Sequence, residues 1–149
     1  FGYVDVRDVA AAHILAMQNP NSNGKRFALS EKDLLDIAAF YSSNVSTGGQ
    51  AKNDTELLEL GTKLYRFGDI KKQIPACTSC HSVYGDGNNL ANYPAVAGQQ
   101  VGYLVSSLKA YRSKERNAGE QSLVMQSIAE NLTDNEIDAL ANYMHGLYK

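Results

Sequence analysis

The chain has 149 residues, of which 44% are hydrophobic and 20% charged, with a formal net charge of −2. This balance is typical of a globular protein, and the length allows one ordinary domain with an appendage. The weakly acidic charge argues against nucleic-acid binding, and no apolar run is long enough to span a bilayer. Residues 1–5 lack the features of a signal peptide, so we expect a removed leader or a start within a longer polypeptide.

Helical patterns recur along the chain, and no alternating segment is long enough to predict a strand. Apolar spacing, capping residues and glycine or proline positions predict helices at residues 6–18, 31–41, 55–67, 99–114 and 134–148. The polar, glycine-bearing residues 42–54 predict a linker, and residues 84–92 form a loop rich in glycine and asparagine. The predicted fold class is therefore all-α.

An internal repeat links two of the predicted helices. Residues 29–41 align with residues 132–144 in their cap, their acidic first turn and most of their apolar positions. One interpretation is that both are simply well-capped amphipathic helices. The other is that residues 29–47 are the end of a preceding, related domain.

The chain's two cysteines lie in the sequence Cys77-Thr78-Ser79-Cys80-His81. A Cys-x-x-Cys-His sequence is typical of c-type haem attachment. Two thiols on one tight turn can each add to a haem vinyl group, and the next histidine can then ligate the iron. A zinc site would need a second pair of ligands, and a thioredoxin-like redox pair would need βαβ patterning, neither of which the sequence offers.

A low-spin electron carrier also needs a sixth iron ligand. Met144 lies on the apolar face of the last predicted helix, and His145 comes too late in the chain to reach across the haem. Met17 and His13 lie far upstream, in the segment least connected to the motif. Met125, in a loop-like stretch between His81 and the last helix, is the favoured ligand, and Met144 remains an alternative.

Histidine–methionine ligation predicts a function. The soft thioether favours ferrous iron and raises the reduction potential, and two protein ligands leave no open position for oxygen or peroxide. We therefore expect an electron carrier and not an enzyme. The alternatives are a haem enzyme or gas sensor with an open or displaceable sixth position, and a subunit whose haem only stabilises the fold.

From Leu29 onward the sequence resembles the bacterial diheme cytochrome c4 group, within class I cytochromes c. The matching pieces are residues 60–69, 74–81, 93–99, 108–112 and 125–129. The resemblance implies a class I cytochrome c fold, with helices wrapped around one covalently bound haem c. The haem would be attached at Cys77 and Cys80, with His81 and Met125 as iron ligands.

The resemblance also implies roles for other residues. The carbonyl of Pro94 matches the acceptor of a hydrogen bond from the ligand histidine. Gly61 and Tyr65 match positions where the first helix of the haem domain crosses the last, and Tyr143 matches an aromatic partner there. The candidates for binding the haem propionates are Gln99, Tyr103 and Arg112.

Two departures from the family pattern shape the predicted domains. Diheme members carry two haem motifs, and this chain has one. In addition, residues 1–28 do not resemble a cytochrome but a segment of the short-chain dehydrogenase/epimerase family, without that family's nucleotide-binding loop. We expect an N-terminal segment of different origin at 1–28 and the end of a preceding cytochrome domain at 29–47. A linker at 48–54 and the haem domain at 55–149 would follow.

The family further implies a periplasmic location in a respiratory chain. The expected partners are redox proteins such as a terminal oxidase or an upstream cytochrome reductase, which would dock near Cys77 and Cys80. Packing against a second cytochrome domain and peripheral membrane association are also compatible with the resemblance. The basic residues Lys109, Arg112, Lys114 and Arg116 would either steer an acidic partner or form a solvated helix face.

Overall fold

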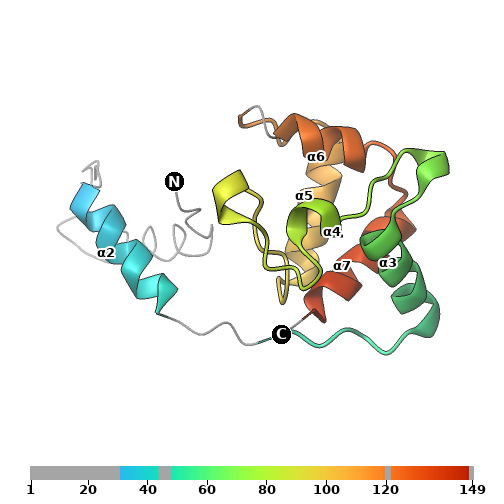
Figure 1. The fold of residues 1–149 in the computed structure, drawn as a ribbon, viewed down its shortest axis with the longest axis horizontal. Coiled ribbons are helices and arrows are strands. Elements are labelled where there is room, and N and C mark those ends of the chain that lie inside the picture. The colour runs from blue at the N-terminus through green and yellow to red at the C-terminus, as the bar shows by residue number, and fades with distance from the viewer. Residues whose placement is uncertain (1–30, 44–47, 120–121, 148–149) are drawn as a thin grey trace, which may run out of the picture. The chain divides into compact units, whose positions relative to one another are not determined.

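A computed structural model describes residues 31–43, 48–119 and 122–147 (Figure 1). The chain divides into two compact units, residues 1–45 and 46–149, and each is described by itself. In the first unit, helix α2 (Glu31–Ser42) begins at the predicted residue and ends one residue later than predicted. The helix predicted at residues 6–18 lies outside the described residues, together with His13 and Met17.

The second unit is built from helices and short 3-10 turns. Its elements are α3 (Thr55–Phe67), η2 (Ile70–Lys72), α4 (Thr78–His81), η3 (Asn89–Ala91), α5 (Val101–Arg112), α6 (Ser122–Ala129) and α7 (Asp134–His145). The described ranges hold two isolated β-bridges and no strand, which confirms the predicted all-α class. None of the helices in these ranges is long and apolar enough to cross a bilayer.

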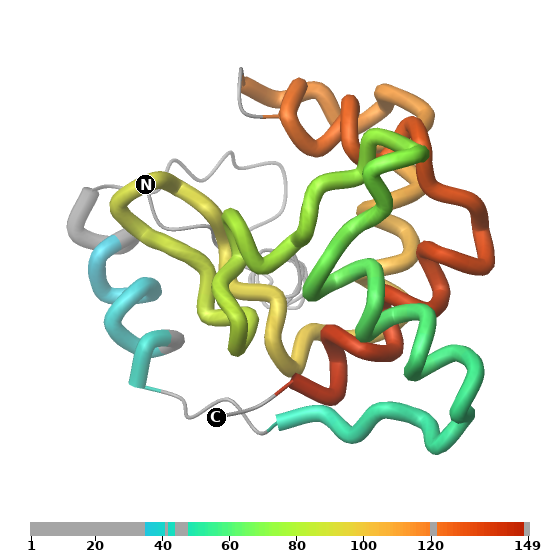
Figure 2. The backbone as a smooth tube through the Cα atoms, turned by 45° about the vertical axis from the view of Figure 1, so that its right-hand side comes forward, coloured from blue at the N-terminus to red at the C-terminus, as the bar shows by residue number. Residues whose placement is uncertain are grey.

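Helices α3 and α7 cross closely, and Gly61 allows the close approach (Figure 2). A Cβ atom built at Gly61 would collide with the carbonyl oxygen of Ala139 and lie 2.8 Å from the Cβ of Tyr143. Beside the crossing, the ring of Tyr65 is fully buried and its centroid lies 5.3 Å from that of Tyr143. The structure therefore contains the helix crossing that the resemblance implied.

Local capping explains where these two helices begin. The side chain of Asp54 accepts a hydrogen bond from the backbone N–H of Leu57 at the start of α3. At the start of α7, Thr133 and Glu136 form a capping box. The side chain of Thr133 accepts from the Glu136 N–H, and the Glu136 carboxylate accepts from the Thr133 N–H.

The hydrophobic core lies where α7 meets α3 and α5. Its buried members come from α3, α5, α6 and α7 and from the segments between them: Leu64, Tyr65, Ile74, Leu104, Leu108, Ala129, Leu132, Ile137, Leu140, Ala141 and Met144. Met144 is 6% exposed, as expected for a core residue of the last helix. Burial of this kind stabilises a fold by roughly 25 cal/mol for each Å² of apolar surface removed from water.

Part of the segment that the sequence predicted as a linker packs against α7. The backbone N–H of Lys52 donates to Oδ1 of Asn142, and Nδ2 of Asn142 donates back to the Lys52 carbonyl. Nearby, a Cβ atom at Gly49 would collide with His145, and one at Gly146 would lie 2.6 Å from the Cβ of Ala51. Residues 49–52 are therefore called the strap below.

Candidate haem-attachment site

Both thiols and the histidine of the motif come from one turn of helix. The carbonyl of Cys77 accepts hydrogen bonds from the N–H groups of Cys80, at 3.2 Å, and His81, at 2.9 Å. This single turn, α4, places Cys77, Cys80 and His81 close together, and the two cysteines are free thiols. The donor set of two thiols and one imidazole on one turn fits a covalently attached haem.

The imidazole of His81 is buried and oriented by a carbonyl group. Its exposed fraction is 9%, and its Nδ1 lies 2.9 Å from the carbonyl oxygen of Pro94. A carbonyl can only accept, so Nδ1 is the protonated nitrogen and Nε2 is left as the nitrogen able to bind iron. This is the hydrogen bond that the resemblance implied between the ligand histidine and the carbonyl of Pro94.

Two loops with the same backbone route flank the attachment turn: residues 68–75 before it and 87–94 after it. Each begins with a glycine of positive φ and ends with a proline. In each loop an Asp or Asn side chain accepts two backbone N–H groups, and a residue in the left-handed region closes a 3-10 turn. An antiparallel bridge completes each loop, joining Asp69 to Ile74 and Asn88 to Tyr93.

The paired loops position two parts of the attachment site. The first leads through Pro75 into Cys77, and the second delivers the Pro94 carbonyl to His81. Sequence reasoning did not identify the paired loops, although their signal is present. A glycine followed by Asp or Asn precedes a Pro-Ala pair by the same spacing in both, Gly68 to Pro75 and Gly87 to Pro94.

Burial affects two side chains at the motif, Tyr65 and Cys77, and Tyr65 also makes a hydrogen bond there. The hydroxyl of Tyr65 donates to the carbonyl of Ser82 at 2.8 Å, which ties α3 to the residue after His81. Burial raises the pKa of Tyr65, so this hydroxyl keeps its proton. Burial likewise raises the pKa of the Cys77 thiol to about 11, so the thiol is neutral near pH 7 before it is modified.

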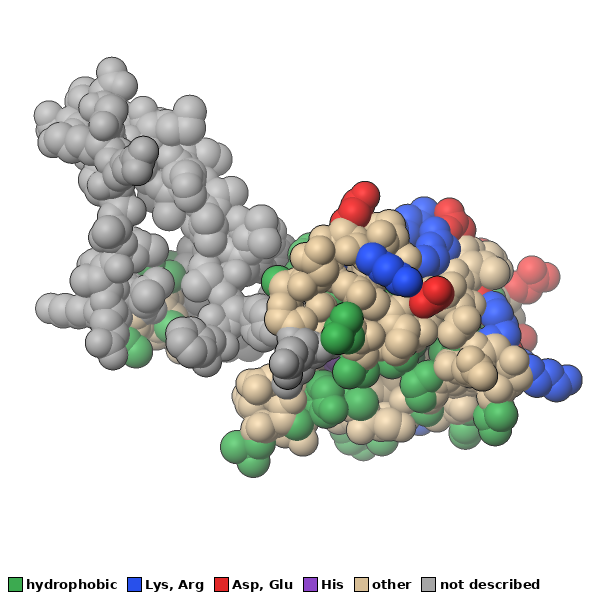
Figure 3. Space-filling view, turned by 90° about the horizontal axis from the view of Figure 1, so that it is seen from above, with side chains coloured by type: hydrophobic (Ala, Val, Ile, Leu, Met, Phe, Trp, Pro, Cys, Tyr) green, Lys and Arg blue, Asp and Glu red, His purple; other side chains and the backbone are tan. Residues whose placement is uncertain are grey.

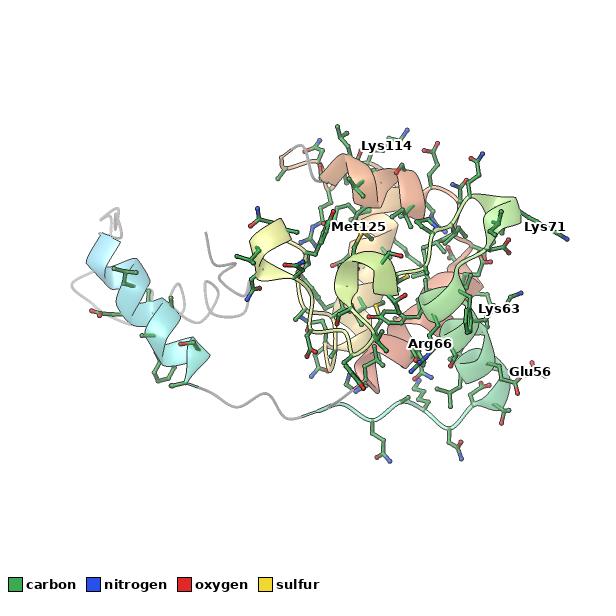
Figure 4. The ribbon with its side chains drawn as sticks, in the orientation of Figure 1. Glu56, Lys63, Arg66, Lys71, Lys114 and Met125 are labelled. Carbon is green, nitrogen blue, oxygen red and sulfur yellow. The ribbon has the colours of Figure 1, made fainter. Side chains whose placement is uncertain are left out.

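Met125 lies in helix α6 and not in the loop that the sequence predicted. The helix was missed because it is short and its apolar residues do not form one clear stripe. Met125 is half-buried and packs against the same core cluster as Cys77. In Figure 4, Met125 lies on the side of α6 toward α4 in this view. Its role as an iron ligand remains a prediction.

The three propionate candidates lie at separate places around α5. The Gln99 carbonyl accepts from Nδ1 of His145 at 2.9 Å, and Tyr103 is 41% exposed. Arg112 donates to Asp134 and to the Leu132 carbonyl, and the hydrogen bonds from Arg112 and Lys109 hold the pKa of Asp134 below its usual value. The propionate role of Gln99, Tyr103 and Arg112 stays a prediction.

The helical fold and the attachment turn define a c-type haem protein of class I. A model of the cytochrome c family matches residues 59–147, and the chain belongs to that family. Cytochromes c bind covalently attached haem c, and the Cys-x-x-Cys-His sequence at residues 77–81 is the motif for that attachment.

Within the family, the chain is similar to cytochrome c4. It is 40% identical to cytochrome c4 of Azotobacter vinelandii over 80% of this chain and 56% of the relative. The crystal structure of reduced recombinant cytochrome c4 from Pseudomonas stutzeri superposes with a TM-score of 0.73 at 40% identity, covering 80% of this chain and 62% of that one. The chain thus spans a little over half of the length of the cytochromes c4 that it matches.

A shorter relative is matched over most of its own length. Cytochrome c-554(548) of Halomonas halodenitrificans is 42% identical over 48% of this chain and 83% of the relative. A nearly complete cytochrome therefore corresponds to about half of this chain.

Proposed function

We propose that this chain carries single electrons through one haem c, attached at Cys77 and Cys80 and ligated by His81 and Met125. The observation that carries the proposal is the hydrogen bond from His81 Nδ1 to the Pro94 carbonyl. The turn that holds His81 also holds both thiols. Such a bond orients a metal-binding imidazole and increases its basicity. When bound, the haem supplies an iron that gains and loses one electron.

The residues of the chain would keep the two oxidation states similar in structure. The Pro94 carbonyl fixes the plane of the His81 ring, and the Tyr65 hydroxyl fixes the backbone behind it. A thioether from Met125 would be a soft ligand that raises the reduction potential. With side chains on both faces, small molecules would have no open position at the iron, as an electron carrier requires.

The names of the relatives support a carrier over an enzyme. The similar proteins include cytochromes c4 and a thiosulfate dehydrogenase electron acceptor from Thiomonas intermedia, which is 30% identical over 87% of this chain. By its name the latter receives electrons from another protein. We propose the same kind of role here, in a bacterial periplasmic respiratory chain with an upstream cytochrome reductase and a terminal oxidase as partners.

Three of the four basic residues at positions 109–116 lie next to carboxylates. Lys109 and Arg112 both pair with Asp134, and Lys114 lies 3.8 Å from Glu130. Figure 3 shows basic and acidic side chains next to each other on one face. We propose instead that partners dock beside the attachment turn, where Val83 and Tyr84 are 47% and 57% exposed. Small contacts of this kind suit brief redox encounters.

The greater length of the relatives supports a further domain in the intact protein. We propose that residues 55–149 are the haem domain, that residues 29–47 are the end of a preceding cytochrome domain, and that residues 48–54 join the two. In that arrangement the haem domain would pack against a second cytochrome domain. Residues 1–28 would then be of different origin.

Absorption spectroscopy of the holoprotein tests the ligand assignment. We expect the ferric protein to show the weak far-red band of a sulfur–iron bond, and the ferrous protein not to bind carbon monoxide. Met125→Ala should abolish the band and allow carbon monoxide to bind, whereas Met144→Leu, which changes a core methionine, should do neither. A parent protein without the band that binds carbon monoxide would instead indicate a haem enzyme or gas sensor.

A further inference from the structure

Arg116, which follows α5, folds back onto one face of that helix. Its guanidinium carbon lies 4.9 Å from the ring centroid of Tyr111 and 6.0 Å from that of Tyr103. Its Nη1 donates to Oγ of Ser107 at 3.0 Å. Since Tyr103, Ser107 and Tyr111 are spaced four residues apart, they share one face of the helix. A cation at these distances is attracted to aromatic rings, so the side chain is attached at several points.

The backbone of the same residue connects α5 to α6. The N–H of Arg116 donates to the carbonyl of Ala110 at 3.1 Å. Its carbonyl accepts a hydrogen bond of 2.8 Å from Nε2 of Gln126. Gln126 is 6% exposed and directly follows Met125 in α6. A continuous set of contacts therefore runs from the tyrosines of α5 through Arg116 to the neighbour of Met125.

Helix α6 combines core packing, through Met125, Ile128 and Ala129, with polar contacts to the preceding loop. Its buried residues are Ser122, Gln126 and Ala129, of which two are polar. Leu123 and Val124, its larger aliphatic residues near the start, are 62% and 45% exposed. The hydroxyl of Ser122 donates to the Gly119 carbonyl at 2.7 Å, which makes a second hydrogen bond from α6 to the preceding loop. Hydrogen bonds to residues 116 and 119 therefore add to core packing in setting the position of α6.

We infer that Arg116 is a positioning residue that controls how firmly Met125 is held as a ligand. Its guanidinium holds the loop against α5. Its carbonyl then helps to fix the position of α6 by accepting the hydrogen bond from Gln126. This inference rests on the proposed function, because it requires Met125 to be the sixth ligand. It differs from the sequence-based interpretation, in which Arg116 belonged to a basic surface and Tyr103 bound a propionate.

The strength of the restraint determines how readily an external ligand replaces the methionine. A thioether is a weak donor, so its occupancy of the iron depends on the protein holding it in place. If a variant loosens α6, the state with the methionine displaced becomes more populated, and a competing ligand binds more tightly by the same factor. Imidazole is a suitable competitor, because it binds ferric haem without requiring a protein contact.

The test is a titration of the ferric holoprotein with imidazole, followed by loss of the far-red sulfur–iron band. Arg116→Met keeps an unbranched apolar stem but removes the guanidinium, with its charge and its side-chain hydrogen bonds, and Gln126→Leu removes the donor to the Arg116 carbonyl. Each should increase the apparent imidazole affinity roughly tenfold, the effect expected when about one hydrogen bond of restraint is lost. The double variant should show less than the product of the two effects, because both changes break one connection.

Lys114→Met is the matched control. Lys114 lies in the same loop, and its side chain is 61% exposed with Glu130 at 3.8 Å. It should bind imidazole like the parent. If Arg116→Met does not yield folded holoprotein, the paired change Ser107→Ala and Tyr103→Phe removes both hydrogen bonds of Nη1 and gives the same measurement.

Two outcomes overturn different claims. Variants that bind imidazole within about twofold of the parent, with the far-red band intact, would show that Arg116 does not control the ligand. A parent protein whose far-red band is absent, or whose imidazole affinity is unchanged in Met125→Ala, would overturn the proposed ligation itself.

Discussion

Asn142 and Lys52 exchange two hydrogen bonds across a separation of 90 residues. Asn142 is 2% exposed, so its amide is a buried polar group whose requirements are met by the backbone of the strap. The strap is therefore part of the fold of the haem domain, although its sequence has the composition of a flexible linker.

Replacing Asn142 with Leu should lower the free energy of unfolding by about 1–3 kcal/mol, because the N–H and carbonyl of Lys52 lose their partners. Denaturant unfolding of the holoprotein measures the change, and limited proteolysis should show earlier cleavage within the strap. Asn53→Leu changes an exposed residue directly after the strap and should leave both measurements nearly unchanged. Equal effects of the two variants would contradict this account.

Gly61→Ala should destabilise the protein by about 1–3 kcal/mol, the range for forcing an atom into a packed contact. The added methyl group would meet the backbone of Ala139 and would push α3 away from α7. Gly102→Ala is the control, since Gly102 lies in α5 and a Cβ atom there has nothing within 4 Å. Because alanine is the better helix former, that variant should gain about 0.5–1 kcal/mol. Urea unfolding of both variants makes the comparison.

Glu136 should contribute to stability in a manner that depends on pH. Burial acts to raise its pKa, but the hydrogen bonds from Lys72 and from Thr133 outweigh burial and hold the pKa below the usual 4.5. The carboxylate is therefore stabilised more in the folded state than in the unfolded state. This stabilisation is present above pH 4.5 and is lost as the pH falls through the lowered pKa.

Glu136→Gln should accordingly unfold at a lower temperature than the parent near neutral pH, and the difference should shrink in acid. Thermal unfolding followed by circular dichroism across this range is the measurement. The neutralising change Glu59→Gln, at an exposed position of α3, is the control and should give a parallel curve. A difference that stays constant down to low pH would show that the carboxylate charge of Glu136 is not involved.

Gly87→Ala should disturb the orientation of the His81 ring by displacing the Pro94 carbonyl. Gly87 has a φ of 73°, and a Cβ atom there would lie 2.6 Å from the carbonyl carbon of Pro94. The displaced carbonyl would no longer hold the imidazole, so the ligand becomes less basic, the ferric state is less stabilised and the reduction potential rises. A redox titration of the holoprotein reports this change.

Gly68→Ala separates this effect from simple backbone strain. Gly68 also has a positive φ, of 69°, but a Cβ atom there would collide with the carbonyl oxygen of Ile74 and not with Pro94. That variant should lose stability from strain while its potential stays at the parent value, because the Pro94 carbonyl is not displaced. A rise in potential of the same size in both variants would rule out a specific effect of the Pro94 carbonyl.

Elements with strong local signals could be predicted from the sequence. Helix α3 spans the predicted residues because Asp54 caps its start and Gly68, with a φ of 69°, ends it. Helix α7 starts as predicted at its capping box but ends at His145, before the predicted residue 148, because Gly146 follows. The attachment turn was identifiable because its three chemical groups are adjacent in the chain.

Features that depend on tertiary contacts could not be predicted. Helix α6 is short and is held by Gln126 and Ser122, whose partners lie in a loop without periodicity. The strap is ordered by Asn142, an amide far away in sequence. Arg116 looked like one of several basic surface residues, and only the folded structure places it against Tyr111. The Asn142–Lys52 and Gln126–Arg116 pairs join residues 90 and 10 positions apart, so local sequence patterns do not reveal them.

The paired loops around the attachment turn imply an uneven tolerance to substitution. Their tips carry Ile70 and Leu90, which are 92% and 99% exposed, so these positions place almost no demand on the side chain. Their bases are far more restrictive, because Gly68 and Gly87 adopt positive φ values with backbone atoms pressed against them. Random mutagenesis should therefore recover many residues at the tips and almost only glycine at the bases. The tips are for that reason natural places to attach a label or an electrode linker without disturbing the histidine between the loops.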